Sequence, residues 1–420
     1  MSELNNIPKN WQVKKLGEVC KFYQGYGFPK DLQGSRSGEY PFYKVGDISK
    51  NVKAGNRFLN LCDNFIDEKT LIKLKAKPYP KHTIVFAKIG EGLKLNRRAI
   101  INKSGIVDNN AIGLKAIESI CNDLFLFHFL TTVKLEDYSK ATTVPSVRKS
   151  EIEDIHFVLP PLTEQLAIVS KIEELLSDLD NGKQQLLTAQ QQLKVYRQSL
   201  LKAAFEGRLT NKEVKDGELP KGWKLVEIGT ICKCIVPNRD KPKSFTGDIK
   251  WVTTPNLSSS SIKLDYPSIS MGLSENETVE YNARVIPSGS VIMTCVGTFG
   301  LSAVIEKPVV INQQLHAFLS SDLVNPKYIA YCIQNSKSYF EHKSTSTTIQ
   351  YLNKSNCNSM PFPLTSIEEQ NQIVDILESK LTVCDKIEET ISQSLLQAET
   401  LKQSILKKAF TSTWLSDLGG

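Results

Sequence analysis

The feature that most constrains the fold of this 420-residue chain is an internal duplication. Three segments return in order. The first pairs IPKNWQVKKLGEVC (7–20) with LPKGWKLVEIGTIC (219–232), the second pairs FVLPPLTEQLAIV (157–169) with FPLTSIEEQNQIV (362–374), and the third pairs LLKAAF (200–205) with ILKKAF (405–410). The offset between partners settles from 212 to 205 residues. Because solenoid repeats are only about 20–50 residues long, this pattern indicates two copies of a domain-sized unit.

The first part of each copy reads as a globular domain with short strands between turn residues. The strand-like runs occupy residues 83–88 and 99–101 in the first copy, and 290–294 and 309–311 in the second. Short helices are expected after Asn122-Asp123 and after Asn325-Pro326, because a cap residue or an early proline opens an apolar-periodic stretch there. This mixture predicts a compact α+β domain.

The second part of each copy reads as one long helix. Its apolar residues advance by alternating steps of four and three, which is the spacing of a coiled-coil seam. The two seams should pack on each other, because a lone helix would leave its leucine stripe in water. A bundle with a helix of another protein is the alternative use of the same stripes. The seam residues are Leu175, Leu179, Leu186, Leu193, Leu200, Ile387, Ile391, Ala398, Leu401 and Ile405.

Together these elements predict an α+β fold with two pseudo-twofold-related α/β domains separated by two long antiparallel coiled-coil helices. The expected boundaries are 1–160 for the first domain, 161–210 for its helix, 211–365 for the second domain and 366–420 for its helix. Pro160-Pro161 blocks a helix before the first seam, and Ser366 with Glu369 forms a capping-box pattern before the second.

The positive charge of the chain is concentrated in the two globular segments. Residues 1–160 carry 25 basic and 17 acidic side chains, a net charge of +8, and residues 211–365 carry 16 and 13, a net charge of +3. The helical segments are neutral (161–210) or carry −4 (366–420). This division favours a polyanionic partner for the globular domains and other partners for the helices.

Several classes of protein are disfavoured by the sequence. It has no apolar run of roughly 18 residues and no apolar leader segment, so we expect a cytoplasmic protein. The five histidines and nine cysteines lack metal-ligand spacing; Cys232 and Cys234 are expected to be core residues, as is His128. Neither a phosphate-binding loop nor the Asn/Asp-Pro-Pro-aromatic motif of amino-methyltransferases is present.

The order and duplication of these motifs resemble the specificity subunit of type I restriction–modification systems over nearly the whole chain. The resemblance is carried by the openings IPKNW and LPKGW, the closings LPPLTEQ and LTSIEEQ, and the helix ends LLKAAFEGRLT and ILKKAFTSTWL. The second copy departs from the pattern where Thr365-Ser366 replaces Pro160-Pro161.

The resemblance implies a non-catalytic subunit whose two target-recognition domains each read one half of a gapped, bipartite DNA site. It also implies two modification (methyltransferase) subunits and restriction (translocase/nuclease) subunits as partners. S-adenosylmethionine, ATP and Mg are then expected on those subunits, with no cofactor, metal or catalytic residue on this chain.

DNA contacts require Arg, Lys, Asn, Gln or aromatic side chains on loops. Paired amides suit adenine edges, and Lys149 and Lys354 suit phosphates. A solvated basic loop, a turn packed by Tyr26 and Phe28, and ordinary turn chemistry are the alternative explanations of these residues. The candidates are Gln24, Tyr26, Lys30, Lys94, Asn96, Arg97, Arg98, Asn109, Asn110, Arg148 and Lys149 in the first domain, and Asn238, Arg239, Lys241, Lys243, Gln313, Gln314, Gln350, Tyr351, Asn353 and Lys354 in the second.

The leading hypothesis is therefore a DNA-recognition subunit. A coiled-coil scaffold whose globular domains bind proteins is the alternative from another class. A specificity subunit of a related methylation-only or phage-defence system is the alternative within the same class. A self-contained nuclease or methyltransferase is disfavoured by the missing motifs.

Overall fold

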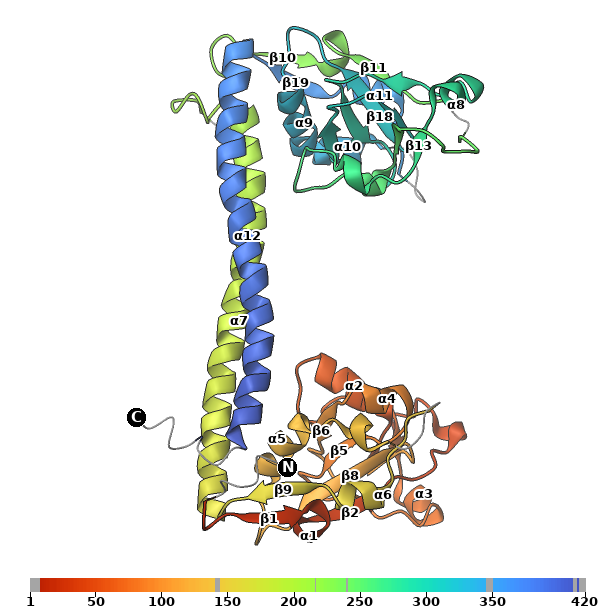
Figure 1. The fold of residues 1–420 in the computed structure, drawn as a ribbon, viewed down its shortest axis with the longest axis vertical. Coiled ribbons are helices and arrows are strands. Elements are labelled where there is room, and N and C mark those ends of the chain that lie inside the picture. The colour runs from red at the N-terminus through yellow and green to blue at the C-terminus, as the bar shows by residue number, and fades with distance from the viewer. Residues whose placement is uncertain are drawn as a thin grey trace. The chain divides into compact units, whose positions relative to one another are not determined.

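The computed structural model describes residues 8–139, 144–215, 217–238, 241–344, 350–410 and 414. By its internal contacts the chain divides into two compact units, Met1–Gln185 with Gln393–Gly420, and Leu186–Ser392. Each unit holds one globular domain and half of each of the two long helices (Figure 1). The helical part of each unit therefore comes from both sequence copies.

The first domain contains a four-stranded antiparallel sheet with the order β2-β8-β5-β6, a three-stranded sheet with the order β4-β3-β7, and the pair β1-β9. Its strands are β1 (Gln12–Lys15), β2 (Cys20–Gln24), β3 (Tyr40–Tyr43), β4 (Phe65–Ile66), β5 (Ile84–Ala87), β6 (Arg98–Ile100), β7 (Ile106–Val107), β8 (Ala111–Ala116) and β9 (His156–Leu159). Its helices and 3-10 turns are α1 (Leu16–Val19), η2 (Lys30–Leu32), α2 (Val45–Lys53), α3 (Glu68–Lys73), α4 (Gly90–Lys94), α5 (Asp123–Thr132), η3 (Leu135–Tyr138) and α6 (Lys149–Glu153).

The second domain repeats this plan with the sheet orders β11-β18-β15-β16 and β13-β12-β17-β14 and the pair β10-β19. Its strands are β10 (Lys224–Glu227), β11 (Lys233–Ile235), β12 (Ile249–Val252), β13 (Gly272–Leu273), β14 (Val285–Ile286), β15 (Val291–Thr294), β16 (Ser302–Val304), β17 (Val309–Ile311), β18 (Leu315–Leu319) and β19 (Pro361–Leu364). Its helices and 3-10 turns are η4 (Ile228–Thr230), η5 (Thr254–Asn256), η6 (Tyr266–Ser268), α8 (Glu275–Glu280), α9 (Pro326–Asn335), α10 (Lys337–Lys343) and α11 (Lys354–Asn358).

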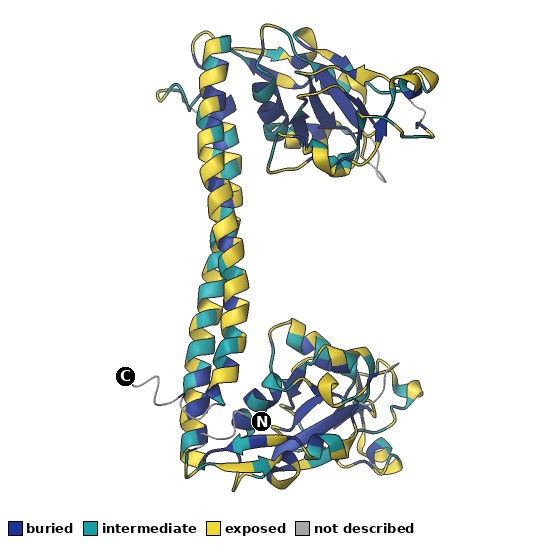
Figure 2. Cartoon of the chain, viewed as in Figure 1, coloured by how far each residue is buried: buried dark blue, intermediate teal, exposed yellow. Residues whose placement is uncertain are grey.

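The duplication predicted from the sequence is confirmed at the level of strand pairing. In both domains one sheet contains a parallel pair, β3 with β7 and β12 with β17, and the sheet that contains β5 or β15 is antiparallel throughout. The four strand-like runs correspond to β5, β6, β15 and β17, and the two predicted short helices are α5 and α9. The central strands of these antiparallel sheets, β5 with β8 and β15 with β18, are almost fully buried, so each sheet lies in the core of its own domain (Figure 2).

The long helices are α7 (Leu162–Phe205) and α12 (Ile367–Ala409), and they pair antiparallel. In the first unit the start of α7 shares a core with the end of α12, through Ile172 and Leu406. In the second unit the end of α7 shares a core with the start of α12, through Leu200 and Leu377. Arg197 adds ion pairs to α12 in the second unit. The predicted coiled-coil pairing of the two helices is therefore confirmed.

Eight of the ten predicted seam residues are buried or half-buried: Leu175, Leu179, Leu186, Leu193, Leu200, Ile391, Ala398 and Ile405. The prediction is wrong for Ile387 and Leu401, whose exposed fractions are 44% and 50%. Ile387 instead lines an open apolar groove together with Leu193 of α7 and Val383 of α12. Spacing alone cannot distinguish a residue inside a two-helix seam from one at its margin.

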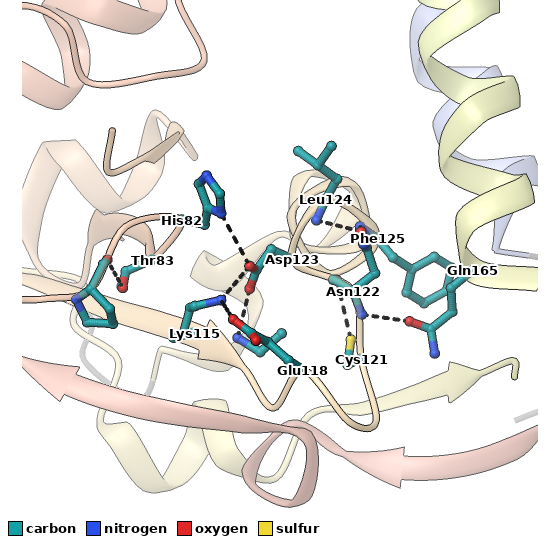
Figure 3. Close-up of polar contacts among 12 residues, drawn as sticks. His82, Thr83, Lys115, Glu118, Cys121, Asn122, Asp123, Leu124, Phe125 and Gln165 are labelled. Atoms are coloured by element: carbon teal, nitrogen blue, oxygen red, sulfur yellow. Dashed lines mark hydrogen bonds and ion pairs between the residues drawn. The ribbon is translucent and has the colours of Figure 1, made fainter. Parts of the chain in front are cut away.

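A buried glutamine fastens the first domain to the start of α7. The amide nitrogen of Gln165 donates to the carbonyl oxygens of Ile120 (2.9 Å) and Pro160 (2.8 Å). Its oxygen accepts from the backbone N–H of Asn122 (2.8 Å), the residue that caps α5 (Figure 3). One side chain thus satisfies three backbone groups in a place from which water is excluded.

The second copy contains the same glutamine clamp. Gln370 is buried, donates to the carbonyls of Leu323 (3.0 Å) and Thr365 (2.9 Å), and accepts from the N–H of Asn325 (2.9 Å), the cap of α9. The second copy has Thr365 where the first has Pro160. This difference leaves the clamp intact, because Gln370 bonds only to the backbone carbonyl of that residue.

The residue before each glutamine holds the tryptophan that opens the copy. The indole N–H of Trp11 donates to Glu164 (2.6 Å), and that of Trp223 donates to Glu369 (2.9 Å). The Ser366 hydroxyl accepts from the N–H of Glu369 (3.3 Å), as a capping box requires, but the Glu369 carboxylate serves the tryptophan instead. In each copy the opening motif and the motif at the start of the long helix are therefore in contact.

A second attachment follows the clamp on each long helix: in the second unit Glu378 of α12 lies 2.8 Å from Lys327 of α9, and in the first unit Glu173 occupies the corresponding place. Glu173 of α7 accepts from Arg57 (2.5 Å) and contacts the ring nitrogen of His128 on α5 (2.7 Å). His128 is buried, as its apolar surroundings in the sequence predict. The hydrogen bond to His128, together with Arg57, lowers the pKa of Glu173 from 4.5 to about 2 against the opposing effect of burial.

Replacing Gln165 by Ala should loosen the first turn of α5, because a buried N–H and two carbonyls lose their partner at a cost of about 1–3 kcal/mol per orphaned group. Amide hydrogen exchange at the start of α5 should accelerate by roughly tenfold while α9 stays protected. The change of Gln370 to Ala should give the reverse pattern. Equal amide hydrogen exchange rates at the starts of α5 and α9 in both variants would contradict the role of the glutamine clamp.

Glu173 should also make the stability of the first unit depend on pH. Because its pKa is lower in the folded state, its contribution is complete above pH 4.5 and is lost as the pH falls toward about 2. Urea unfolding should therefore show Glu173→Gln less stable than the wild type at pH 6, with the difference shrinking below pH 4.5. Glu174→Gln, at an exposed neighbour on α7, is the matched control. A difference that is constant with pH would disprove this role.

Candidate nucleic-acid interface

The paired amides of the two domains occupy equivalent turns. In the first domain the turn 108–110 joins β7 to β8, and the Asp108 carboxylate accepts from the N–H of Asn110 (2.8 Å). In the second domain the turn 312–314 joins β17 to β18, and the Asn312 side chain accepts from the N–H of Gln314 (3.1 Å). A short polar side chain that holds the N–H two residues later fixes such a turn.

In the first domain, backbone hydrogen bonds join this turn to two other segments. The N–H of Lys88, just after β5, donates to the carbonyl of Asn110 (2.9 Å). The N–H of Val147 then donates to the carbonyl of Lys88 (3.0 Å). The segment before α6 is therefore tied to the amide turn through the end of β5.

The second domain repeats the same bonds. The N–H of Cys295 donates to the carbonyl of Gln314 (2.8 Å), and the N–H of Leu352 donates to the carbonyl of Cys295 (2.8 Å). We call the three joined segments of each domain the amide edge. It comprises residues 88–90, 108–110 and 145–149 in the first domain and 295–297, 312–314 and 350–354 in the second.

Ten of the 21 candidate DNA-contact residues lie on the two amide edges with exposed side chains. In the first domain these are Asn109, Asn110, Arg148 and Lys149, and in the second they are Gln313, Gln314, Gln350, Tyr351, Asn353 and Lys354. Segments that lie about 20–30 residues or more apart in the sequence thus present amides and cations on one surface of each domain. This arrangement has the residue types that base edges and phosphates require.

Some of these side chains also have structural partners. Asn353 caps α11 by accepting from the N–H of Asn356 (2.8 Å). Lys149 lies 3.2 Å from Glu153 and 5.6 Å from the ring centre of Phe22. The ammonium group of Lys149 can exchange this surface ion pair for a phosphate at little cost, because exposed pairs contribute little stability.

The loop after β2 lies against the amide turn of the first domain. The N–H of Tyr26 donates to the carbonyl of Val107 (2.9 Å), and a side chain at Gly25 would place its Cβ 1.8 Å from the carbonyl oxygen of Asp108. Tyr26 packs against the core, and its hydroxyl accepts from the backbone N–H of Lys77 (3.1 Å). For Tyr26 the structure therefore agrees with the alternative of a packed turn. Gln24 and Lys30 remain exposed beside it.

The basic loop 94–99 differs from the prediction. Arg98 is 4% exposed at the start of β6, where it donates to Asn96 (2.8 Å) and to the carbonyl of Val133 (3.1 Å). Burial lowers the pKa of Arg98 to about 9. The prediction that Arg98 contacts DNA is therefore wrong, because the run of charges enters a buried strand. Asn96 is occupied by the same network, Lys94 is exposed, and Arg97 is half-buried.

In the second domain part of the loop 237–243, including Arg239, lies outside the described residues. Asn238 donates to the carbonyl of Asn282, while Lys241 and Lys243 are exposed. Lys241 also lines a recess of about 290 Å³ next to the amide turn. The other lining residues are Trp251, Thr253, Met271, Asn312, Gln313 and Gln314. Sequence reasoning missed Trp251, Thr253 and Met271, because separate strands bring them to the turn.

Within the described ranges, no group of three or more His, Cys, Asp or Glu side chains is placed to hold a metal ion. Among the helices described, none is both long and apolar enough to cross a membrane.

The chain was compared with proteins of known family and structure. A chain from a solved type I R-M system, described in terms of its complex assembly and conformational transition, has a TM-score of 0.74 at 19% identity, covering 96% of this chain and 98% of that one. The HsdS subunit of Thermoanaerobacter tengcongensis has a TM-score of 0.62 at 19% identity, covering 98% and 99%. These likenesses support the fold.

Sequence relatives agree with the fold. The EcoBI specificity subunit of Escherichia coli is 23% identical over 99% of this chain and 89% of its own length. The MjaVIII specificity subunit of Methanocaldococcus jannaschii is 23% identical over 96% and 93%. The family model of the type I restriction modification DNA specificity domain matches twice, at residues 8–189 and 220–397. With two such domains spanning most of its length, the chain belongs to the type I restriction–modification DNA specificity family.

Proposed function

We propose that this chain is the non-catalytic DNA-specificity subunit of a type I restriction–modification complex, and that each amide edge reads one half of a gapped, bipartite site. Residues 1–160 and 211–365 are the two target-recognition domains in this proposal. Residues 161–210 and 366–420 supply the helices that separate them. Because the side chains of the two edges differ, the two half-sites differ in sequence.

The observation that carries the proposal is the repetition of one exposed edge on two copies of a domain. Its backbone bonds are the same in both domains, whereas its side chains have diverged from Asn109 and Asn110 to Gln313 and Gln314. A rigid backbone with variable polar side chains is what sequence-specific readers use to change their target. The net charges of +8 and +3 on the two domain segments supply attraction for the phosphates.

The paired helices serve partner subunits in this proposal, because their segments are neutral or acidic and unsuited to DNA. In the second unit they form an apolar groove of about 600 Å³ that includes Leu193 and Tyr196 of α7 and Val383, Cys384 and Ile387 of α12. We assign this groove to a helix of a modification subunit. An exposed apolar stripe on two paired helices accommodates a further helix. S-adenosylmethionine, ATP and Mg belong to the modification and restriction subunits.

The function is tested by mapping DNA methylation across the host genome with and without the gene. Loss of one bipartite methylated motif on deletion, and its return on complementation, is the expected result. A complementing gene with Asn109 and Gln313 changed to Ala should restore a motif that is relaxed in both halves. An unchanged methylation pattern after deletion would favour the scaffold alternative.

The groove is tested by assembly with the modification subunits. Val383→Asp should weaken the complex by at least tenfold, because a carboxylate would be buried against an apolar helix. Val195→Asp is the matched control, since Val195 and Val383 are each 54% exposed and only Val383 lines the groove. The dissociation constant can be followed by sedimentation or light scattering. Equal weakening by both changes would count against the groove.

A further inference from the structure

The recess beside the second amide turn combines two kinds of surface. Asn312, Gln313 and Gln314 form an amide wall, and Trp251 and Met271 contribute apolar area. Met271 is 37% exposed, so its side chain is accessible from the recess. The recess has a volume of about 290 Å³.

The amide wall has one side chain that is free to bind. Gln314 accepts at its side-chain oxygen from Thr254 (3.2 Å) and Asn312 (3.3 Å), so its orientation serves the turn. The side chain of Gln313 is exposed and makes no hydrogen bond to any residue that the structure describes. A glutamine amide offers one donor and one acceptor in a plane, which matches N7 and the N6 amino group of adenine in the major groove.

The apolar side of the recess matches the other half of the same base pair. The thymine C5-methyl group projects into the major groove next to the adenine edge, and apolar side chains recognise it by contact. The thioether of Met271 is flexible and polarisable, and it adapts to such a methyl group. No arginine is among the described residues that line the recess, although arginine is the side chain best suited to guanine.

We propose that this recess reads one A·T base pair of the second half-site, with Gln313 on the adenine edge and Met271 against the thymine methyl group. Lys241, at the rim, holds a backbone phosphate. The assignment rests on the proposed DNA-specificity function, to which it adds one base pair and the two side chains that read it.

The test uses the complex assembled with its modification subunits and duplexes carrying the mapped site. Each adenine is replaced in turn by 7-deazaadenine, which lacks the N7 acceptor, and each thymine by uracil, which lacks the methyl group. At one A·T pair the wild type should lose roughly tenfold in affinity for each replacement. Gln313→Ala should be insensitive to 7-deazaadenine there, and Met271→Ala should be insensitive to uracil.

Two controls separate recognition from general damage. Met271→Leu keeps an apolar side chain and should remain sensitive to uracil, whereas Asn109→Ala changes the other domain and should respond to both replacements as the wild type does. Equal penalties in the wild type and Gln313→Ala at every position, or a second half-site without an A·T pair, would overturn the assignment. A complex that binds all duplexes alike would instead overturn the proposed function itself.

Discussion

The structure of each unit depends on one buried glutamine at the start of a long helix. Gln165 and Gln370 each join the helix, the loop before the short helix and that helix's cap by three hydrogen bonds. A buried amide is stable only when its donors and its acceptor are all satisfied, so the three backbone segments must meet in one geometry. The adjacent glutamate holds the opening tryptophan in the same way. The opening tryptophan and the start of the following long helix, at the two ends of each domain's sequence, therefore fix that domain to the helices of its unit.

Within each domain, the attachment and the amide edge involve different elements. The clamp uses the start of the long helix and the cap of α5 or α9, whereas the edge uses the ends of β5 and β7 or of β15 and β17. Because backbone bonds join the three segments of the edge, side chains without a structural partner there, such as Gln313, can change without loss of the fold. This separation explains how two copies that share one architecture present Asn109 in one case and Gln313 in the other.

Much of the fold was predictable from spacing, and much of the site was not. The repeat, the long helices and the short capped helices followed from periodicity and cap residues, which act over a few turns of chain. The errors have a common cause. Arg98 belongs to a charged run but begins a buried strand, and Ile387 and Leu401 have the right residue type at the margin of the seam. Burial depends on which strand or helix lies opposite, and no local pattern encodes that neighbour.

The sequence by itself determined the duplication, the antiparallel helical pairing and the family, because each depends on motifs repeated in order along the chain. It also identified the paired amides at 109–110 and 313–314 as turn residues after a strand. Only the tertiary structure decided that these turns are tied to the segments before α6 and α11, and that Met271 and Trp251 lie beside Gln313. The physical reason is that a recognition surface is assembled from the ends of several strands. The topology of the sheets decides which of these strand ends lie close together.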